Sequence, residues 1–275
     1  MIAYLDTNAF DHIYRKIGCT SADIANLRKA IYGRQLSIRM SIHTLEEILL
    51  GRKTSPQAFA AQIKLTLSLA SSRTLLKSCA QLLLDDIRAY AARGEADRPF
   101  LRSDIQNAVA DGIAALIESD GEELEEDFLA VLDQARQDKQ GFFTALEHAG
   151  QEAETIPRPP SGWTSFEHYF DAAALPGLET MAEQAGVTAS CRERGLNGLL
   201  KIKSVRMSLC AALAHSYEQV TAGAAANSIT LHHAVSAAAV AEAFVSDVAV
   251  SREFVARLPI ESLNVVSLAE FLKGL

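Results

Sequence analysis

The stretch IAYLDTNAF, residues 2–10, is the segment around which the other expected elements are arranged. A short apolar run that breaks abruptly into polar residues is typical of a buried β-strand. If residues 2–5 form a central strand of a parallel sheet, Asp6 lies at its carboxyl end, where open α/β sheets bind ligands. Thr7 and Asn8 then begin a helix, where they can cap backbone N–H groups or orient the Asp6 carboxylate. The alternative is a helix cap with no further role, because caps are far commoner than metal ligands.

The composition is that of a globular protein with a sizeable core. The chain has 275 residues, 49% of them hydrophobic, which suffices for one large domain or two small ones. No apolar run approaches the ~20 residues of a membrane span and no secretion signal is recognised, so a cytoplasmic protein without a membrane partner is expected. The four scattered cysteines predict buried thiols rather than a zinc or disulfide framework.

Two further predicted strands lead into acids. Residues 36–40 alternate weakly and are followed by a helix that Ser41 can cap. Glu46 and Glu47 both border the apolar stripe of that helix, and their spacing alone does not decide which of them points inward. Residues 244–247, Phe-Val-Ser-Asp, repeat the pattern of a brief apolar strand and a following acid. Strand-and-helix units are therefore expected at both ends of the chain.

The middle of the chain has a different character. Long segments with helical periodicity between residues 55 and 154 predict an inserted helical region. Residues 157–162 are rich in proline and are expected to form a loop or hinge. A group of aromatic residues follows at helical spacing and is expected to be core more often than a base-stacking surface; it consists of Trp163, Phe166, Tyr169 and Phe170.

The net charge of −8 argues against a protein that coats nucleic acid through charge alone. Any RNA site must therefore be local or completed by a partner. One concentrated basic segment is the best candidate for phosphate contacts, although an ordinary solvated helix face is an equally good interpretation. Its members are Arg192, Arg194, Lys201, Lys203 and Arg206.

The acids that follow strands suggest a chemistry. Asp6 and Asp247 at strand ends and Glu47 on a helix just after a strand converge only if their strands lie side by side in one parallel sheet. Clustered carboxylates raise one another's pKa unless a cation neutralises them, so such a cluster predicts a Mg²⁺ or Mn²⁺ site. These ions activate water and stabilise leaving oxygens in phosphodiester hydrolysis. The sequence has no Gly-rich P-loop that would indicate nucleoside triphosphate hydrolysis instead.

Three segments together resemble the PIN-domain family: residues 4–10, residues 41–49 with Glu47, and residues 237–247, which end in Ala-Glu-Ala-Phe-Val-Ser-Asp. The resemblance implies an α/β fold with a parallel sheet flanked by helices and an acidic divalent-metal site that cleaves RNA. Many bacterial members of the family are toxins of toxin–antitoxin pairs. The PIN-like α/β domain is expected to comprise residues 1–54 and 205–275, and the all-helical insertion residues 55–204.

The resemblance also assigns roles. Asp6 matches the family's first acid, Asn8 its supporting polar residue and Glu47 its second acid. Asp247 matches the acid that follows the fourth strand. The resemblance thus implies Asp6, Glu47, Asp247 and Asn8 as catalytic residues, with the three acids as metal ligands, and Arg192, Arg194, Lys201 and Lys203 are the expected RNA contacts.

Two positions depart from the family pattern. Thr230, with Ser228 and His232 nearby, stands where the family usually has an Asp, and Val248 stands where many members keep an acid. Losing a carboxylate lowers the charge and the affinity of a Mg²⁺ site. His232 and His233 raise a second idea, a transition-metal or general-base role, against which stands local hydrogen bonding at a helix start.

The expected function is a metal-dependent endoribonuclease that hydrolyses RNA phosphodiester bonds, as a toxin or defence effector. Expected partners are RNA and a protein antitoxin or regulator, and a homodimer is an expected assembly. The alternative is a degenerate PIN-like domain that binds RNA or protein without cleaving, and the residue at position 230 motivates it.

Overall fold

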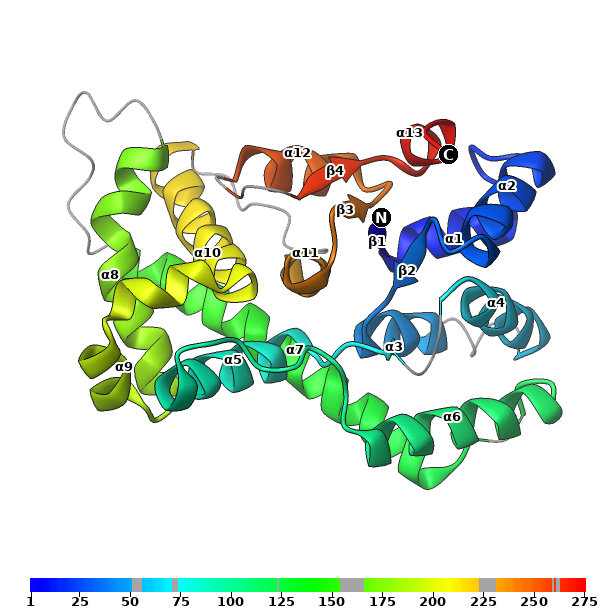
Figure 1. Ribbon diagram of the computed structural model, residues 1–275, viewed down its shortest axis with the longest axis horizontal. Coiled ribbons are helices and arrows are strands. Elements are labelled where there is room, and N and C mark those ends of the chain that lie inside the picture. Colours follow the sequence, from blue (N-terminus) through cyan, green and yellow to red (C-terminus); the bar gives the residue numbers. More distant parts are fainter. Residues whose placement is uncertain are drawn as a thin grey trace.

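A computed structural model describes residues 1–50, 56–70, 74–122, 124–153, 166–222, 231–258, 260 and 263–275. Its sheet has four parallel strands in the order β2-β1-β3-β4 (Figure 1). The strands are β1 (Ile2–Leu5), β2 (Ser37–Arg39), β3 (Ala243–Val245) and β4 (Asn264–Val266). Leu5 pairs with Val245, which in turn pairs with Val266, so three strands end level with one another. The expected α/β class with a parallel sheet is confirmed.

Helices follow or precede these strands in sequence. The segment after β1 contains α1 (Thr7–Arg15) and α2 (Ser21–Tyr32), and α3 (Ile42–Leu50) follows β2. The segment that surrounds β3 and β4 contains α11 (Leu231–Val240), α12 (Ala249–Arg257) and α13 (Leu268–Lys273). Because parallel strands point the same way, the helices that start after β1 and β2 start at the same edge of the sheet.

The helical middle lies between α3 and α11. Its helices are α4 (Pro56–Leu69), α5 (Cys79–Arg93), α6 (Ser103–Glu118), α7 (Glu126–Ala153), α8 (Phe166–Gln184), α9 (Thr188–Arg194), the 3₁₀ helix η3 (Leu196–Lys201) and α10 (Lys203–Ala222). In Figure 1, α5, α8, α9 and α10 gather on one side, while α6 reaches out below α4. None of the described helices combines the length and apolarity that crossing a bilayer requires.

Two apolar cores lie on the two faces of the sheet, because successive strand residues point to opposite sides. Tyr4 and Phe244 belong to a core shared with α5, α8, α10 and α11, whereas Leu5 and Val245 belong to a core shared with α1 to α4, α6 and α13. Helix α7 contributes to both cores. Phe128, near the start of the helix, packs in the second core, and Phe142, in a later turn, packs in the first. Residues of the expected insertion thus pack directly on both faces of the sheet.

The aromatic group of the sequence is part of the first core where it is described. Tyr169 and Phe170 on α8 are buried, and Tyr169 lies 5.5 Å from the ring of Tyr217 on α10. The interpretation of these aromatics as core is confirmed. Trp163 and the proline-rich residues 157–162 lie outside the described residues. All four cysteines are buried and free, as expected.

Candidate functional site

Three distant segments bring polar side chains to the carboxyl edge of β1. Asp6 and Thr7 follow β1 directly, Glu47 lies on α3, and His232 and His233 lie in the first turn of α11. Helix α11 packs against both β1 and β3, and α3 packs against α1. The topology therefore joins residues as far apart in the chain as Thr7 and His233, which are separated by 226 positions.

The carboxylate of Glu47 is the centre of this group. Its Oε1 lies 2.8 Å from Nε2 of His232, and its Oε2 lies 3.0 Å from Nε2 of His233. The Thr7 hydroxyl donates to Oε2 at 2.5 Å. Within the described residues, Glu47, His232 and His233 form the group of His, Cys, Asp or Glu side chains whose ligand atoms all lie within 4.8 Å of one another. We call these three residues the Glu47 cluster.

Helix α7 contributes a fixed positive charge beside the cluster. The Lys139 ammonium pairs with Glu46 Oε2 and also lies 3.2 Å from Glu47 Oε1. Arg136, one turn earlier, pairs with Glu46 Oε1 at 3.3 Å. Glu46 is 1% exposed and is held by these two cations, whereas Glu47 turns toward the histidines. The structure thus separates the two adjacent acids that the spacing of the sequence left open.

A buried hydrogen-bond chain holds His233 in place. Nδ1 of His233 lies 2.7 Å from the Tyr4 hydroxyl, which lies 2.8 Å from the Ser41 hydroxyl at the start of α3. Burial raises the pKa of Tyr4, so its phenol keeps its proton for this chain. His233 therefore presents Nε2 to Glu47 in one fixed orientation.

His232 is packed between aromatic rings. Its ring lies 4.1 Å from that of His233, and edge-on contacts join it to His43 at 5.0 Å and Phe143 at 5.5 Å. Burial lowers the pKa of His232 to about 3 and lowers that of His43 well below its usual value. Both rings are therefore neutral at pH 7. Nδ1 of His232 is buried and has no hydrogen-bond partner in the part of the chain that is described.

The pKa values of the two acids at the site are shifted in opposite directions. Although burial alone raises the pKa of Glu47, the charge of His233 and hydrogen bonds from His232 and His233 hold it well below its usual range. Burial dominates at Asp6, which is fully buried, and raises its pKa. Asp6 Oδ1 accepts the Ala9 N–H at 2.8 Å and so caps α1, while Oδ2 has no partner among the described residues.

Asp247 lies at the same edge of the sheet but has other contacts. Its Oδ2 lies 2.6 Å from Nδ1 of His12 on α1, and its Oδ1 accepts the N–H of Leu268 at 2.9 Å. Asp247 thereby ties α1 to the start of α13. Of the three expected metal ligands, Glu47 lies in the cluster and Asp6 interacts electrostatically with it.

Thr7 contacts Glu47, where Asn8 is the expected supporting residue. Asn8 is exposed on the first turn of α1, and the side chain that contacts Glu47 is its neighbour Thr7. Val248 is the residue that precedes α12. Thr230 and Ser228 lie outside the described residues. His232 and His233 follow position 230 after Leu231, in the first turn of α11.

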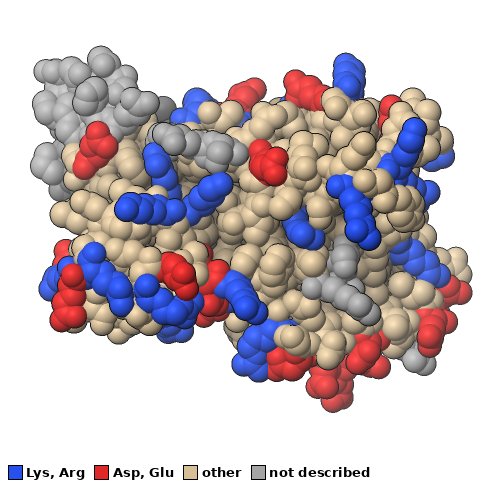
Figure 2. Space-filling model, in the orientation of Figure 1, with Lys and Arg blue, Asp and Glu red and all other residues tan. Residues whose placement is uncertain are grey.

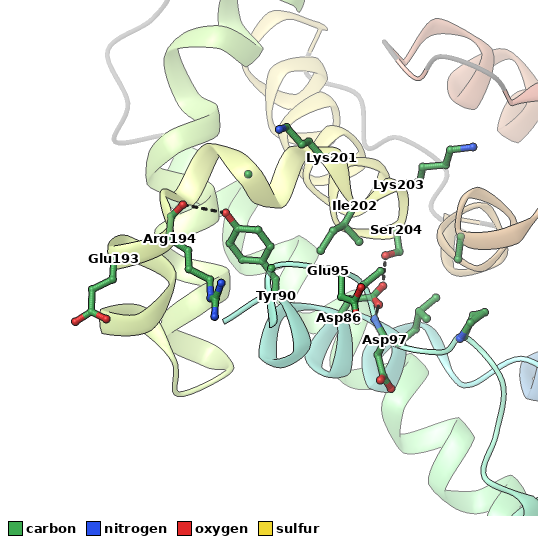
Figure 3. A pocket seen from close by; sticks show the side chains of 16 residues that line it. Asp86, Tyr90, Glu95, Asp97, Glu193, Arg194, Lys201, Ile202, Lys203 and Ser204 are labelled. Carbon is green, nitrogen blue, oxygen red and sulfur yellow. Dashed lines mark hydrogen bonds between the residues drawn. The ribbon is translucent and has the colours of Figure 1, made fainter. Parts of the chain in front are cut away.

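The basic segment lies elsewhere, beside a cleft of about 710 Å³ formed by α5, the loop after it, η3 and the start of α10 (Figure 3). Arg192 pairs with Glu179, and the Arg194 guanidinium binds the carbonyls of Ala91 and Ala92 at the end of α5. Those two arginines therefore have structural contacts. Lys201 and Lys203 are exposed and line the cleft.

Acids also line the cleft. Asp86 is 2% exposed and accepts the Asp97 N–H at 2.8 Å and the Ser204 hydroxyl. Asp97 in turn pairs with the buried Lys77 at 2.7 Å. Figure 2 likewise shows basic side chains mixed with acidic ones on the face that it presents. The expected RNA contacts at this segment stay a prediction.

Some residues of the site were outside the reach of sequence reasoning. Lys139 lies 92 positions from Glu47, on a helix with no motif of its own. Tyr4 is indistinguishable in sequence from an ordinary buried strand residue. The adjacent histidines were a usable signal, because two imidazoles at a helix start are uncommon enough to be weighed as ligands.

Comparisons with protein-family models, with curated proteins and with solved structures find no match to this chain. Its function is therefore inferred from the geometry of the site and from the motifs quoted above.

Proposed function

We propose that the protein is a metal-dependent endoribonuclease of the PIN-like type that hydrolyses RNA phosphodiester bonds. The observation that supports this most is the gathering of Asp6, Glu47, His232 and His233 at the carboxyl edge of a parallel sheet. That edge is where open α/β sheets hold ligands. Titratable groups with pKa values shifted in opposite directions are typical of catalytic centres, because chemistry needs both a proton holder and a fixed charge.

The donor atoms decide which ion fits. Mg²⁺ prefers an octahedral set of oxygen atoms. In the described part of the chain, the carboxylates of Asp6, Glu47 and Asp247 do not form one ligand group, and Asp247 already binds His12 and Leu268. The expected three-carboxylate Mg²⁺ site therefore does not fit this arrangement. A divalent ion that accepts nitrogen as well as oxygen fits the Glu47 cluster better.

The protein's own groups have distinct tasks in this proposal. A bound divalent ion supplies an activated water and polarises the phosphate. Glu47 provides the negative charge of the site and is 21% exposed, so it faces the surface from which RNA approaches. Lys139 is 15% exposed and presents an ammonium that can pair with a phosphate oxygen. Asp6, with its raised pKa and an unpaired oxygen, can hold a proton next to the reacting groups.

A non-cleaving binding domain is the second candidate, and one observation favours it. Thr7, His232, His233 and Lys139 together satisfy both oxygens of Glu47 without any ligand. A carboxylate that is fully paired within the protein can serve a purely structural role. RNA or a protein partner then binds without hydrolysis.

The test is cleavage of an end-labelled pool of structured and single-stranded RNAs by the purified protein. Parallel reactions contain Mg²⁺, Mn²⁺ or Zn²⁺, or EDTA alone. We expect metal-dependent cleavage that falls at least ~100-fold in Glu47→Gln, which keeps the size of the side chain but removes its charge. Glu118→Gln, an exposed acid at the end of α6, is the matched control and should cleave normally.

Two results decide between the candidates. If the wild type cuts no RNA under any condition but retains it on a filter, the non-cleaving candidate is correct. If Glu47→Gln cuts as well as the wild type, the reaction takes place elsewhere. A role as a toxin or defence effector predicts that expression in bacteria arrests growth, that Glu47→Gln relieves the arrest, and that a protein antitoxin blocks it.

A further inference from the structure

We propose that Glu47, His232 and His233 form a binding site for a transition-metal ion of the Zn²⁺ class, in place of the Mg²⁺ that the acidic motifs suggest. This inference identifies the cofactor of the site described above. It rests on the proposed function only in the claim that the ion takes part in catalysis. Binding of the ion is a separate property that can be measured when no RNA is cleaved.

The distances suit a single ion between the three side chains. Zn²⁺ holds histidine nitrogens and carboxylate oxygens at about 2.0–2.2 Å, so two ligands at a tetrahedral angle stand about 3.4 Å apart. The two Nε2-to-oxygen distances at Glu47 are 2.8 and 3.0 Å. All three ligand atoms lie within 4.8 Å of one another, and an ion between them would move each nitrogen a few tenths of an ångström away from the carboxylate, to about 3.4 Å. Two imidazoles and one carboxylate leave a coordination position open, which is the pattern of catalytic rather than structural zinc sites.

The chemical character of the ligands favours this class of ion over Mg²⁺. Imidazole nitrogen suits Zn²⁺, Fe²⁺, Co²⁺ and Ni²⁺, whereas Mg²⁺ keeps oxygen ligands and water. Both imidazoles are buried, with each histidine 1% exposed. Their Nε2 atoms both lie beside the Glu47 carboxylate, so two nitrogen donors and the oxygen donors face one place.

The surroundings of His233 have the form of a ligand's support. A metal-bound histidine usually donates its second ring N–H to an acceptor that fixes its orientation. The second nitrogen of His233 is bound to the Tyr4 hydroxyl, and that hydroxyl is bound to Ser41. Ser41 immediately precedes the helix that carries Glu47. One buried chain of hydrogen bonds thus positions ligands from two elements.

The two cations beside the cluster are paired with Glu46. Arg136 and Lys139 both contact Glu46, and Lys139 also lies 3.2 Å from Glu47. Lys139 can keep its contact with Glu46 when an ion takes Glu47. Without an ion, each imidazole donates an N–H to one oxygen of Glu47, and the same atoms close into a hydrogen-bond network.

The experiment is isothermal titration of full-length protein, stripped of metal with a chelator, with Zn²⁺, Co²⁺ and Mg²⁺ separately. We expect one Zn²⁺ or Co²⁺ per chain and at least ~100-fold weaker binding of Mg²⁺. The visible spectrum of the Co²⁺ form should show the intense bands of a four- or five-coordinate site with nitrogen ligands. Glu47→Gln and His233→Gln should each abolish this stoichiometric binding and these bands.

Matched controls separate the cluster from other acids and imidazoles. Glu118→Gln and His12→Gln should bind Zn²⁺ as the wild type does. Tyr4→Phe, which removes the hydroxyl but keeps the ring, should weaken binding about 10- to 100-fold through loss of orientation. Circular dichroism of each variant shows whether it is folded, and a folded Glu47→Gln that still binds one Zn²⁺ contradicts the site.

The possible outcomes also separate this inference from the proposed function. Absence of stoichiometric Zn²⁺ and Co²⁺ binding to the wild type, or Mg²⁺ binding as tight as Zn²⁺, overturns the inference. Zn²⁺ binding at the cluster without cleavage of any RNA supports the inference and refutes the ribonuclease. Mg²⁺-dependent RNA cleavage by a protein that does not bind Zn²⁺ at the cluster supports the ribonuclease and overturns the inference.

Discussion

The surroundings of Glu47 and of Asp247 differ, although sequence patterns present both as acids that follow short strands. Glu47 is surrounded by side-chain donors from three elements, and two of them are imidazoles. Asp247 is bound by the His12 imidazole and by a backbone N–H at the start of α13, and the Arg252 guanidinium lies 3.9 Å from its Oδ1. The side-chain partners of Glu47 can give way to an ion, whereas the contacts of Asp247 join α1, α12 and the start of α13. The same local pattern thus yields a candidate centre in one place and a structural tie in another.

The largest effect should follow from removing the Lys139 ammonium, which joins α7 to Glu46 and Glu47. Lys139→Met leaves the buried Glu46 with Arg136 as its one cation among the described residues. Leaving a buried charge underpaired typically costs about 3–5 kcal/mol of unfolding free energy. Urea denaturation measures the loss, and Lys203→Met on the exposed start of α10 should cost less than about 0.5 kcal/mol. Equal effects of the two substitutions would contradict the assigned role of Lys139.

His232, which lies beside Glu47, should make the stability of the protein depend on pH. Folded His232 has a pKa of about 3, whereas the unfolded residue takes up a proton below about 6.5. The unfolded state therefore binds more protons, and stability falls as the pH falls from about 6.5 toward 3. His232 alone should remove about 2 kcal/mol between pH 7.5 and pH 5.

Three other shifted groups also contribute to the pH dependence. The lowered pKa of His43 acts with the same sign as that of His232 and in the same pH range. The lowered pKa of Glu47 has the same sign and acts below its unfolded value, while the raised pKa of Asp6 opposes them. Urea midpoints at several pH values measure the slope. His232→Gln should flatten it between pH 7 and 5, and an unchanged slope would show that His232 is not a buried neutral ring.

A smaller effect is expected on the Asp247 side. Asp247→Asn removes the charge that faces His12 but keeps an oxygen that can accept the Leu268 N–H. We expect a loss of about 1 kcal/mol in unfolding free energy, with RNA cleavage largely retained. Loss of cleavage at unchanged stability would instead support Asp247 as a metal ligand, as the sequence motif implies.

The smallest expected effect concerns α7, the helix that carries Lys139. Gly141 lies on this helix two residues further on, is exposed, and has open space where a side chain would begin. Gly141→Ala should therefore stabilise the protein by about 0.5–1 kcal/mol without altering the site. Thermal unfolding measures this, and destabilisation would mean that the helix is not continuous there.

The sequence predicts the strands and the helices that follow them well, because each has a local signal. The apolar run before Asp6 and the acid after β3 mark two adjacent strands, and Ser41 stands directly before α3. It could not show that α7 packs on both sides of the sheet, since no local pattern specifies the partner of an amphipathic helix.

The site was predictable where a motif supplied it. Asp6 and Glu47 were found because they follow strands, and His232 and His233 because they are adjacent. The preference of Glu47 for imidazoles and of Asp247 for a helix start depends on side-chain directions across elements, which spacing does not encode. Lys139 was missed for the same reason, as its contact joins residues 92 positions apart.

The most direct test of the Glu47 cluster as the functional centre is an anomalous difference map, recorded at the zinc edge, from crystals grown with Zn²⁺. We predict one peak about 2.0–2.2 Å from a Glu47 oxygen and from Nε2 of both His232 and His233. A map with no peak there would contradict the assignment. A main peak between His12 and Asp247 would contradict it as well and would place the metal centre at Asp247.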